Sequence, residues 1–80
     1  MTRYIAVFYN KEKHHESPQS EQVYEFSTLI EIKYYLLHNE DDLDCVDVYD
    51  YENNELLKTF EVCVIKKIYE IHEVYKGEKE

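Results

Sequence analysis

The sequence contains very few of the residues that form tight turns and strained loops. Gly77 is the only glycine and Pro18 the only proline among the 80 residues. A glycine-rich phosphate-binding loop needs several glycines, because glycine reaches positive φ at the least cost. The single glycine of this chain therefore excludes such a loop. An EF-hand calcium loop needs a glycine at its sixth position, and none follows the alternating acids that begin at Asp42 and Asp44. Both of these ligand classes are therefore disfavoured.

Long hydrophobic runs are also missing. The apolar run near the N-terminus, residues 4–9, is six residues long. It is too short for the apolar core of a signal peptide and far too short to span a bilayer. We therefore expect a cytoplasmic protein without membrane contact. The apolar share of 44% is enough for one thin core, so residues 1–80 are predicted to form a single domain.

Cysteine and histidine are too few, and too poorly spaced, to indicate a metal site. Cys45 and Cys63 show no CxxC spacing, and the adjacent His14 and His15 cannot present ligands like an i, i+4 pair on a helix. We expect no metal and no cofactor, and we expect the cysteines to be reduced, mostly buried thiols. A disulfide or redox role, or a loop metal site that includes Glu16, remains the alternative.

No arrangement of residues typical of an enzyme is evident. Ser17 and Ser20 lie near the histidines, but in a segment without apolar residues that would order a pocket. The cysteines have no neighbouring base in the sequence. The many carboxylates are expected to be exposed, and their pKa values would then be too low for general acid work at neutral pH. We therefore expect a protein without catalytic activity.

Basic residues are scarce, and the excess of acids is concentrated in one segment. Nine Lys and Arg stand against 18 Asp and Glu, for a net charge of −9. Residues 39–55 contain eight of the acids and no base, which leaves ten acids against nine bases elsewhere. This charge argues against direct binding of nucleic acid or an anionic membrane and favours a basic partner surface. A purely solubilising role is the alternative.

The first half of the chain predicts two strands joined by a polar loop. Residues 3–10 include an unbroken run of β-branched and aromatic side chains, typical of a central strand covered on both faces. Residues 11–22 contain no apolar side chain and are predicted to form a flexible polar loop, in which Pro18 excludes a continuous helix. Residues 23–26 are predicted to be a short second strand.

A helix is predicted to begin after Thr28. Thr28 with Glu31 three residues later matches the capping box, in which each side chain satisfies a free backbone N–H. Asn39 is a plausible end. The spacing of apolar residues predicts one broad buried face. Its members are Leu29, Ile30, Ile32, Leu36 and Leu37.

The acidic segment is predicted to continue into a hairpin. Residues 44–51 alternate like a strand, with Val46 and Val48 facing the core and Asp47 facing away. Residues 52–55 are predicted to be a turn, because asparagine tolerates the positive φ of a tight hairpin. Residues 56–62 are predicted to return as its partner strand.

Residues 63–76 fit a helix or a strand. Their apolar residues line one helical face, whereas their β-branched and aromatic residues favour a strand. Periodicity is given the greater weight and predicts a helix, with a frayed tail at residues 77–80. The resulting fold class is α+β, in a β-β-α-β-β-α arrangement. Its small antiparallel sheet would have the order 2-1-3-4, with both helices on one face.

Tyrosines accompany the acids along the predicted hairpin. Tyrosine buries a large area at low entropic cost and keeps a polar tip, so it is frequent at interfaces. For Tyr49 and Tyr51, a role in a protein interface and a merely structural role at the edge of the core are equally favoured. The predicted partner-binding residues are Glu40, Asp41, Asp42, Asp44, Asp47, Tyr49, Asp50, Tyr51, Glu52 and Glu55.

In size, charge and Tyr/Asp-rich strands the chain resembles small acidic proteins of phages and mobile elements that block nucleic-acid enzymes. These include anti-CRISPR proteins, restriction inhibitors and uracil-glycosylase inhibitors. No motif carries the resemblance, so it implies a nucleic-acid-mimic function without assigning any residue a role. The alternative is a homo-oligomeric structural or regulatory domain, whose open sheet face or edge strand at residues 23–26 would pair with a second copy.

Overall fold

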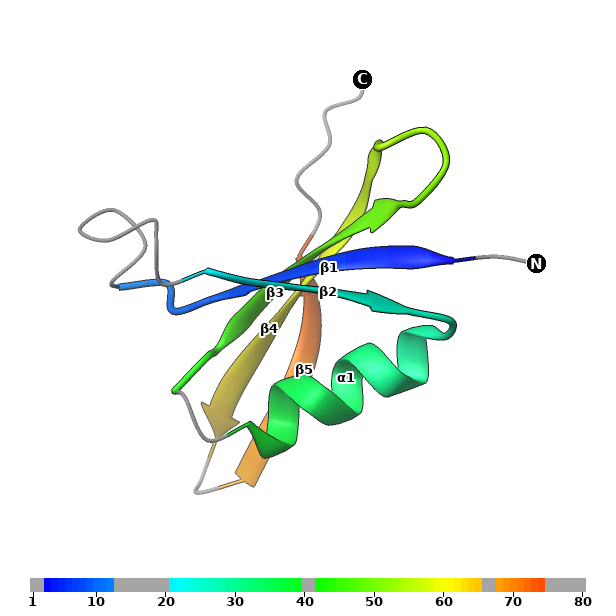
Figure 1. Ribbon diagram of the computed structural model, residues 1–80. Coiled ribbons are helices and arrows are strands. Elements are labelled where there is room, and N and C mark those ends of the chain that lie inside the picture. Colours follow the sequence, from blue (N-terminus) through cyan, green and yellow to red (C-terminus); the bar gives the residue numbers. More distant parts are fainter. Residues whose placement is uncertain (1–2, 13–20, 40–41, 66–67, 75–80) are drawn as a thin grey trace.

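One antiparallel sheet and one helix make up the part of the chain that the computed structural model describes, residues 3–12, 21–39, 42–65 and 68–74. The sheet order is β2-β1-β3-β4-β5, and α1 lies across one face of the sheet (Figure 1). The fold class is therefore α+β, as predicted. In chain order the elements are β1 (Tyr4–Tyr9), β2 (Gln22–Phe26), α1 (Leu29–His38), β3 (Cys45–Asp50), β4 (Leu56–Ile65) and β5 (Ile68–Val74).

The first strand lies inside the sheet, where its apolar run predicted it. β1 pairs with β2 on one side and with β3 on the other, so that Ala6 lies opposite both Tyr24 and Val48. Strands β1 and β2 are consecutive in the chain, but β3 reaches the far side of β1 only after α1 has crossed the sheet. The predicted order 2-1-3-4 is confirmed for these four strands.

The prediction of a second helix at residues 63–76 is wrong. β4 continues to Ile65, and residues 68–74 form β5, which pairs with β4 from Thr59↔Val74 to Ile65↔Ile68. A helix would have left β4, at ten residues the longest described strand, as a bare edge. Pairing with β5 satisfies that edge with backbone hydrogen bonds, and the β-forming side chains of the segment suit a strand. Local propensity and pairing together outweighed the helical periodicity.

Thr28 caps α1 as predicted, but the Glu31 carboxylate accepts from the Thr28 hydroxyl and not from a backbone N–H. Its hydroxyl oxygen accepts a hydrogen bond from the Glu31 backbone N–H at 3.2 Å, and its own proton is donated to Glu31 Oε1 at 2.8 Å. At the other end Asn39 has extended backbone and terminates the helix. The start and the stop of this helix were therefore both encoded locally.

The core lies between α1 and the sheet. Val46 and Val48 are fully buried there, as predicted, beneath Ile32 and Leu36 of the helix. The predicted broad buried face of α1 is only partly correct, because Ile30 and Leu37 are exposed. The buried core cluster consists of Ala6, Phe8, Ile32, Leu36, Leu43, Val46, Val48 and Phe60.

Several predictions fall on residues outside the described part of the chain. These are residues 13–20 of the polar loop, the acids Glu40 and Asp41, and the tail at residues 77–80. The described start of the loop, Lys11 and Glu12, forms a turn, and β2 begins at Gln22, one residue earlier than predicted.

Candidate interaction surface

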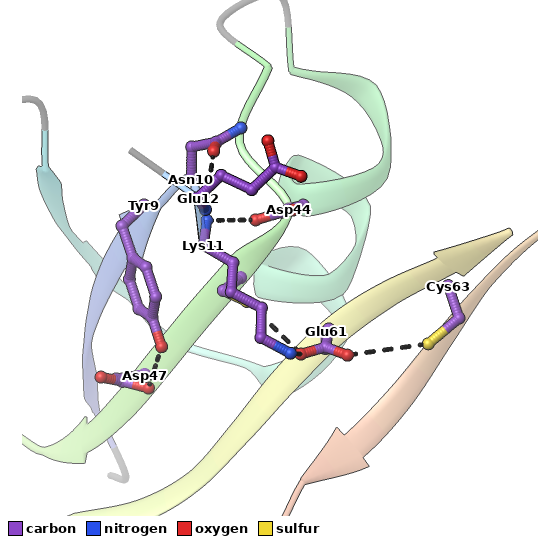
Figure 2. A network of polar contacts seen from close by, with 9 residues as sticks. Tyr9, Asn10, Lys11, Glu12, Asp44, Asp47, Glu61 and Cys63 are labelled. Atoms are coloured by element: carbon purple, nitrogen blue, oxygen red, sulfur yellow. Dashed lines mark hydrogen bonds and ion pairs between the residues drawn. The ribbon is translucent and has the colours of Figure 1, made fainter. Parts of the chain in front are cut away.

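The sheet face opposite α1 carries a connected set of polar side chains. Strand alternation turns these side chains away from the helix, and the pairing register places them in adjoining rows. Figure 2 shows the hydrogen bonds and ion pairs that link β1, β3 and β4 across this face. The residues that carry the network are Tyr9, Lys11, Asp44, Cys45, Asp47, Thr59, Glu61 and Cys63.

Asp47 sits at the middle of β3 and accepts two side-chain hydrogen bonds on one oxygen. The Tyr9 hydroxyl donates to Asp47 Oδ1 at 3.2 Å, and the Thr59 hydroxyl donates to the same atom at 2.7 Å. Tyr9 and Thr59 are both buried. Burial raises the pKa of Tyr9, and the nearby Asp47 carboxylate raises it further. Asp47 therefore ties three strands together as a structural acceptor.

Lys11 links the start of β3 with β4. Its backbone N–H donates to Asp44 Oδ1 at 2.8 Å, and its Nζ lies 2.9 Å from Glu61 Oε2 (Figure 2). The hydrogen bond and charge of Glu61 raise the pKa of Lys11. Lys11 is exposed, so this pair is worth little in stability. It nevertheless places one cation beside Glu61, an acid outside the predicted partner-binding set.

Both cysteines contact Glu61. Cys45 Sγ lies 3.8 Å from Glu61 Oε2, and Cys63 Sγ lies 3.9 Å from Oε1. Both are free thiols, Cys45 buried and Cys63 half-buried. Cys45 lies opposite Glu61 in the register, so Cys63 is its diagonal neighbour, a spacing wider than a disulfide tolerates.

The chemistry of Cys45 does not suit a nucleophile. Burial raises its pKa to about 12, and the Asp44 and Glu61 carboxylates act in the same direction. A thiol with this pKa holds only about one part in 10⁵ as thiolate at pH 7, and the thiolate is the reactive form. The environment of Cys45 therefore suppresses its reactivity.

Asp50 organises the turn between β3 and β4. Its carboxylate accepts from the Glu52 backbone N–H at 3.1 Å and from Asn53 Nδ2 at 2.8 Å. Asn54 has φ of 57° and donates its backbone N–H to the Asp50 carbonyl at 2.8 Å. The prediction that an asparagine here takes positive φ is confirmed. Glu55 and Glu52 are exposed on this well-connected turn.

Tyr51 at the base of the same turn contacts Arg3, the residue before β1. Its backbone N–H donates to the Arg3 carbonyl at 3.2 Å, and the Arg3 guanidinium lies 5.6 Å from the centre of its ring. The ring remains substantially exposed. Tyr51 thus combines an exposed face with a defined position beside a cation.

The connector from α1 to β3 is held by asparagine side chains. Asn39 Nδ2 donates to the carbonyls of Leu36 and Leu43 at 2.8 and 3.0 Å, and its Oδ1 accepts the Leu43 backbone N–H at 3.0 Å. Asn10 Nδ2 donates to the Asp42 carbonyl at 2.7 Å, where Asp42 has φ of 58°. These contacts fix where the acids at this end of β3 lie.

The structure places the predicted partner-binding residues at three positions: at the start of β3, along it, and at its end and in the turn that follows. Asp42 and Asp44 lie at the start of β3, whereas the turn acids lie beyond its end. A six-residue strand separates the groups by roughly 20 Å. Asp47 and Tyr49 lie between them on the open face, and burial raises the pKa of Tyr49.

The residues that pair with this segment were missed in the sequence. Tyr9, Thr59 and Glu61 come from β1 and β4, and only the register reveals that they adjoin the acids of β3. For Thr59 and Glu61 the sequence did contain a signal. They flank the core residue Phe60 in β4, and alternation along a strand therefore places both on the face opposite the core.

No three or more His, Cys, Asp and Glu side chains within residues 3–12, 21–39, 42–65 and 68–74 are arranged to hold a metal ion. In the same residues no helix has the length and apolar character needed to cross a membrane. Comparisons with protein-family models, with curated proteins and with solved structures find no match to this chain. The interpretation of the surface therefore depends on its own chemistry.

Proposed function

We propose that this chain is a small acidic protein-interaction module that binds the basic, nucleic-acid-binding surface of an enzyme in the cytoplasm. In this proposal it acts as an inhibitor of the nucleic-acid-mimic type, without catalytic activity or cofactor of its own. Phages and mobile elements use proteins of this general make-up against CRISPR effectors, restriction enzymes and uracil glycosylases. The partner would be a protein, and neither nucleic acid nor a membrane would be bound directly.

The observation that carries the proposal is the concentration of charge. Eight acids and no base occur in residues 39–55, while the remaining 63 residues are nearly neutral. Solubility alone would be served by acids spread over the whole surface. Clustered acids instead produce a local field that attracts a basic surface and speeds association.

The internal contacts suggest a division of labour within the segment. Asp44, Asp47 and Asp50 accept hydrogen bonds from neighbouring groups, and we propose that they mainly hold the segment in shape. Exposed carboxylates would provide the steering, with Glu52 and Glu55 on the turn between β3 and β4.

Two more exposed residues complete the proposed contact surface. Asp42 is exposed at the opposite end of β3 and would add to the steering. Tyr51, exposed beside the turn, would supply buried area and hence affinity on binding. The proposed surface therefore consists of Tyr51, which would supply affinity, and of exposed acids near both ends of β3, which would supply steering.

The test uses a panel of purified enzymes: a CRISPR effector nuclease, a restriction endonuclease and a uracil-DNA glycosylase. Each is assayed for activity on duplex DNA with increasing amounts of this protein, at low and at high salt. We expect inhibition of at least one enzyme, competitive with DNA and weaker at high salt because charge attraction is screened. Inhibition that does not depend on salt contradicts the mimic mechanism.

Two triple variants with equal changes in charge provide the matched comparison. D42N/E52Q/E55Q removes exposed acids of the proposed surface, and E31Q/E70Q/E73Q removes exposed acids elsewhere, where glutamine still serves in the capping box. We expect the first variant to weaken inhibition about tenfold or more and the second to leave it nearly unchanged. Equal effects of the two variants would mean that only net charge matters.

A further inference from the structure

The helix α1 has a second apolar stripe, on the side away from the core. Ile30 is 78% exposed, Tyr34 66% and Leu37 42%. Spacings of four and three residues place these three side chains next to one another on one side of the helix. Ile32 and Leu36, which are buried, occupy the opposite side. The helix is therefore apolar toward solvent as well as toward the sheet.

A groove of about 420 Å³ runs beside this stripe. It is lined by Phe26, Ile30, Glu31, Tyr34, Tyr35 and His38. The Tyr35 ring lies 6.0 Å from that of Phe26 and 5.3 Å from that of Tyr24, measured between centroids. Aromatic surface therefore continues without a break from the helix to β2, which is an edge strand of the described sheet.

The edge at β2 lacks the features that usually prevent strand pairing. β2 has a regular register with β1 over five pairs and contains no proline or lysine. Its one charged residue, Glu25, lies 3.2 Å from the Arg3 guanidinium, and Val23 and Tyr24 are 60% and 43% exposed. Charges, prolines and bulges are the usual protection of an exposed edge.

The opposite edge of the sheet provides a contrast within the same molecule. β5 carries Glu70, His72 and Glu73, all of them exposed, in a strand of seven residues. Charged side chains at this density disfavour the approach of another strand. The two edges differ in chemistry, and only β2 is suited to pairing.

We propose that β2 and the groove between β2 and α1, which Ile30 and Tyr34 of the stripe line, form a homodimer interface. Two copies would pair antiparallel through β2 about a two-fold axis at Tyr24, the middle residue of the strand. The two sheets would then form one continuous ten-stranded sheet. Both helices would lie on the same face of it, flanking the junction, where the grooves beside β2 would be covered.

Charge favours a second copy as the occupant of this surface. In the proposed dimer the two β3 strands are separated by five strand spacings, or roughly 24 Å. This exceeds the Debye length of about 8 Å at physiological ionic strength, so the two acidic segments repel each other only weakly. A basic partner, in contrast, would be drawn to those acidic segments and away from β2.

The available area is consistent with a reversible dimer. The exposed parts of Val23, Tyr24, Ile30 and Tyr34 together offer on the order of 500 Å² of mostly apolar surface. A standard interface buries about 800 Å² on each partner, and backbone and polar atoms of β2 would supply much of the remainder. We therefore expect dimerisation to depend on protein concentration.

The first test is light scattering of the whole chain from low micromolar to millimolar concentration. We expect the mass to rise from 9.8 kDa toward twice that value. The variants V23E, which would place a like charge opposite Glu25 of the second copy, and I30E, both at exposed positions, should each raise the dissociation constant about tenfold or more. The matched control is L57E, at an apolar residue of β4 with 42% exposure, and it should leave the constant unchanged.

A cross-linking test addresses the two-fold axis. Directly opposed residues in antiparallel strands have Cα atoms about 4.5–5.5 Å apart, within the range of a disulfide. The variant Y24C in a C63S background should therefore form a covalent dimer under mild oxidation. C63S alone, treated in the same way, should form no covalent dimer because Cys45 is buried.

A mass of 9.8 kDa at every concentration overturns the proposal, as does a dimer that V23E and I30E leave intact. The dimer is independent of the proposed inhibitor function, and the two are distinguished by salt. Added salt should leave the dimer unchanged or strengthen it, whereas it should weaken binding to a basic partner. Loss of dimerisation in V23E with inhibition retained would support both proposals separately.

Discussion

The Tyr9 hydroxyl and the Asp47 carboxylate are hydrogen-bonded at 3.2 Å across β1 and β3, on the sheet face opposite the helix. The same carboxylate oxygen accepts the Thr59 hydroxyl of β4 at 2.7 Å. An acid from the most charged segment of the chain is thus an acceptor for two buried donors. Charge in this protein has a structural role as well as a proposed binding role.

Replacing Asp47 with alanine should destabilise the fold. Thr59 is 2% exposed, and its hydroxyl would lose this acceptor in a place where water cannot readily replace it. The expected loss is about 1–3 kcal/mol of unfolding free energy, measured by urea denaturation. D47N keeps an acceptor oxygen while removing the same charge, so it should cost clearly less. Equal losses in D47A and D47N would show that the charge, and not the hydrogen bonds, provides the stability.

Asn39 should be the most sensitive position in the connector. Its amide donates to two carbonyls and its oxygen accepts one N–H, so that it closes the chain between α1 and β3. N39D loses both donors and places a negative charge against two carbonyl oxygens. We expect a loss of about 1–3 kcal/mol by urea denaturation.

Asn53 provides the control for this substitution. Its side chain is exposed in the turn and donates to the Asp50 carboxylate. N53A should change the unfolding free energy by less than about 0.5 kcal/mol, as is usual for exposed positions. A similar effect of N39D and N53A would contradict the proposed role of Asn39.

The helix cap at Thr28 predicts a smaller effect. T28A removes the oxygen that accepts the Glu31 N–H, at a cost of about 1 kcal/mol. For a domain of this size such a cost lowers the melting temperature by about 4–8 °C, measured by circular dichroism. T28S keeps the hydroxyl, and its melting temperature should lie within about 2 °C of that of the parent, because serine caps helices about as well as threonine does. Identical melting of T28A and the parent would indicate that tertiary packing alone determines the start of α1.

Alkaline pH should destabilise the protein in a way that depends on Cys45. Burial raises the pKa of its thiol to about 12 in the folded chain, against about 8.5 in an unfolded chain. Its stabilising contribution is therefore present below about pH 8.5 and is lost as the pH rises toward 12. The raised pKa of Tyr9 acts in the same direction at somewhat higher pH.

The measurement is urea denaturation at pH 7 and pH 10 for the parent and for C45A. The parent should lose more unfolding free energy than C45A over this interval, by on the order of 1 kcal/mol. Alkylation provides a second measurement: at pH 7 the half-buried Cys63 should react with iodoacetamide well before Cys45. Faster alkylation of Cys45, or an equal loss in C45A, would show that the thiol is not held in its protonated form.

Local signals in the sequence determined much of this fold. Val46 and Val48 alternate with polar residues, and this pattern alone placed them in the core. Thr28 marked the start of the helix, because capping involves only residues three positions apart. The apolar run of β1 indicated its place inside the sheet, and with it the order of four strands.

The sequence predicted which segment carries the candidate surface, but not which of its side chains are available to a partner. The sequence located the excess of acids, because charge is a property of composition and needs no folding argument. Which carboxylates have internal partners depends on Tyr9, Lys11 and Thr59, and these approach β3 only when the strands pair. The sequence alone therefore does not distinguish exposed acids from acids that accept hydrogen bonds within the protein, and only the strand register does.

By itself, then, the sequence determined the class of the fold, the cap and turn of its elements, and the concentration of charge in one segment. Tertiary structure alone decided that residues 68–74 form a strand and that Ile30 and Leu37 face solvent. The physical reason is the same in both cases. Periodicity records that a side is apolar, but pairing with β4 and the position of α1 on the sheet decide which apolar sides are covered.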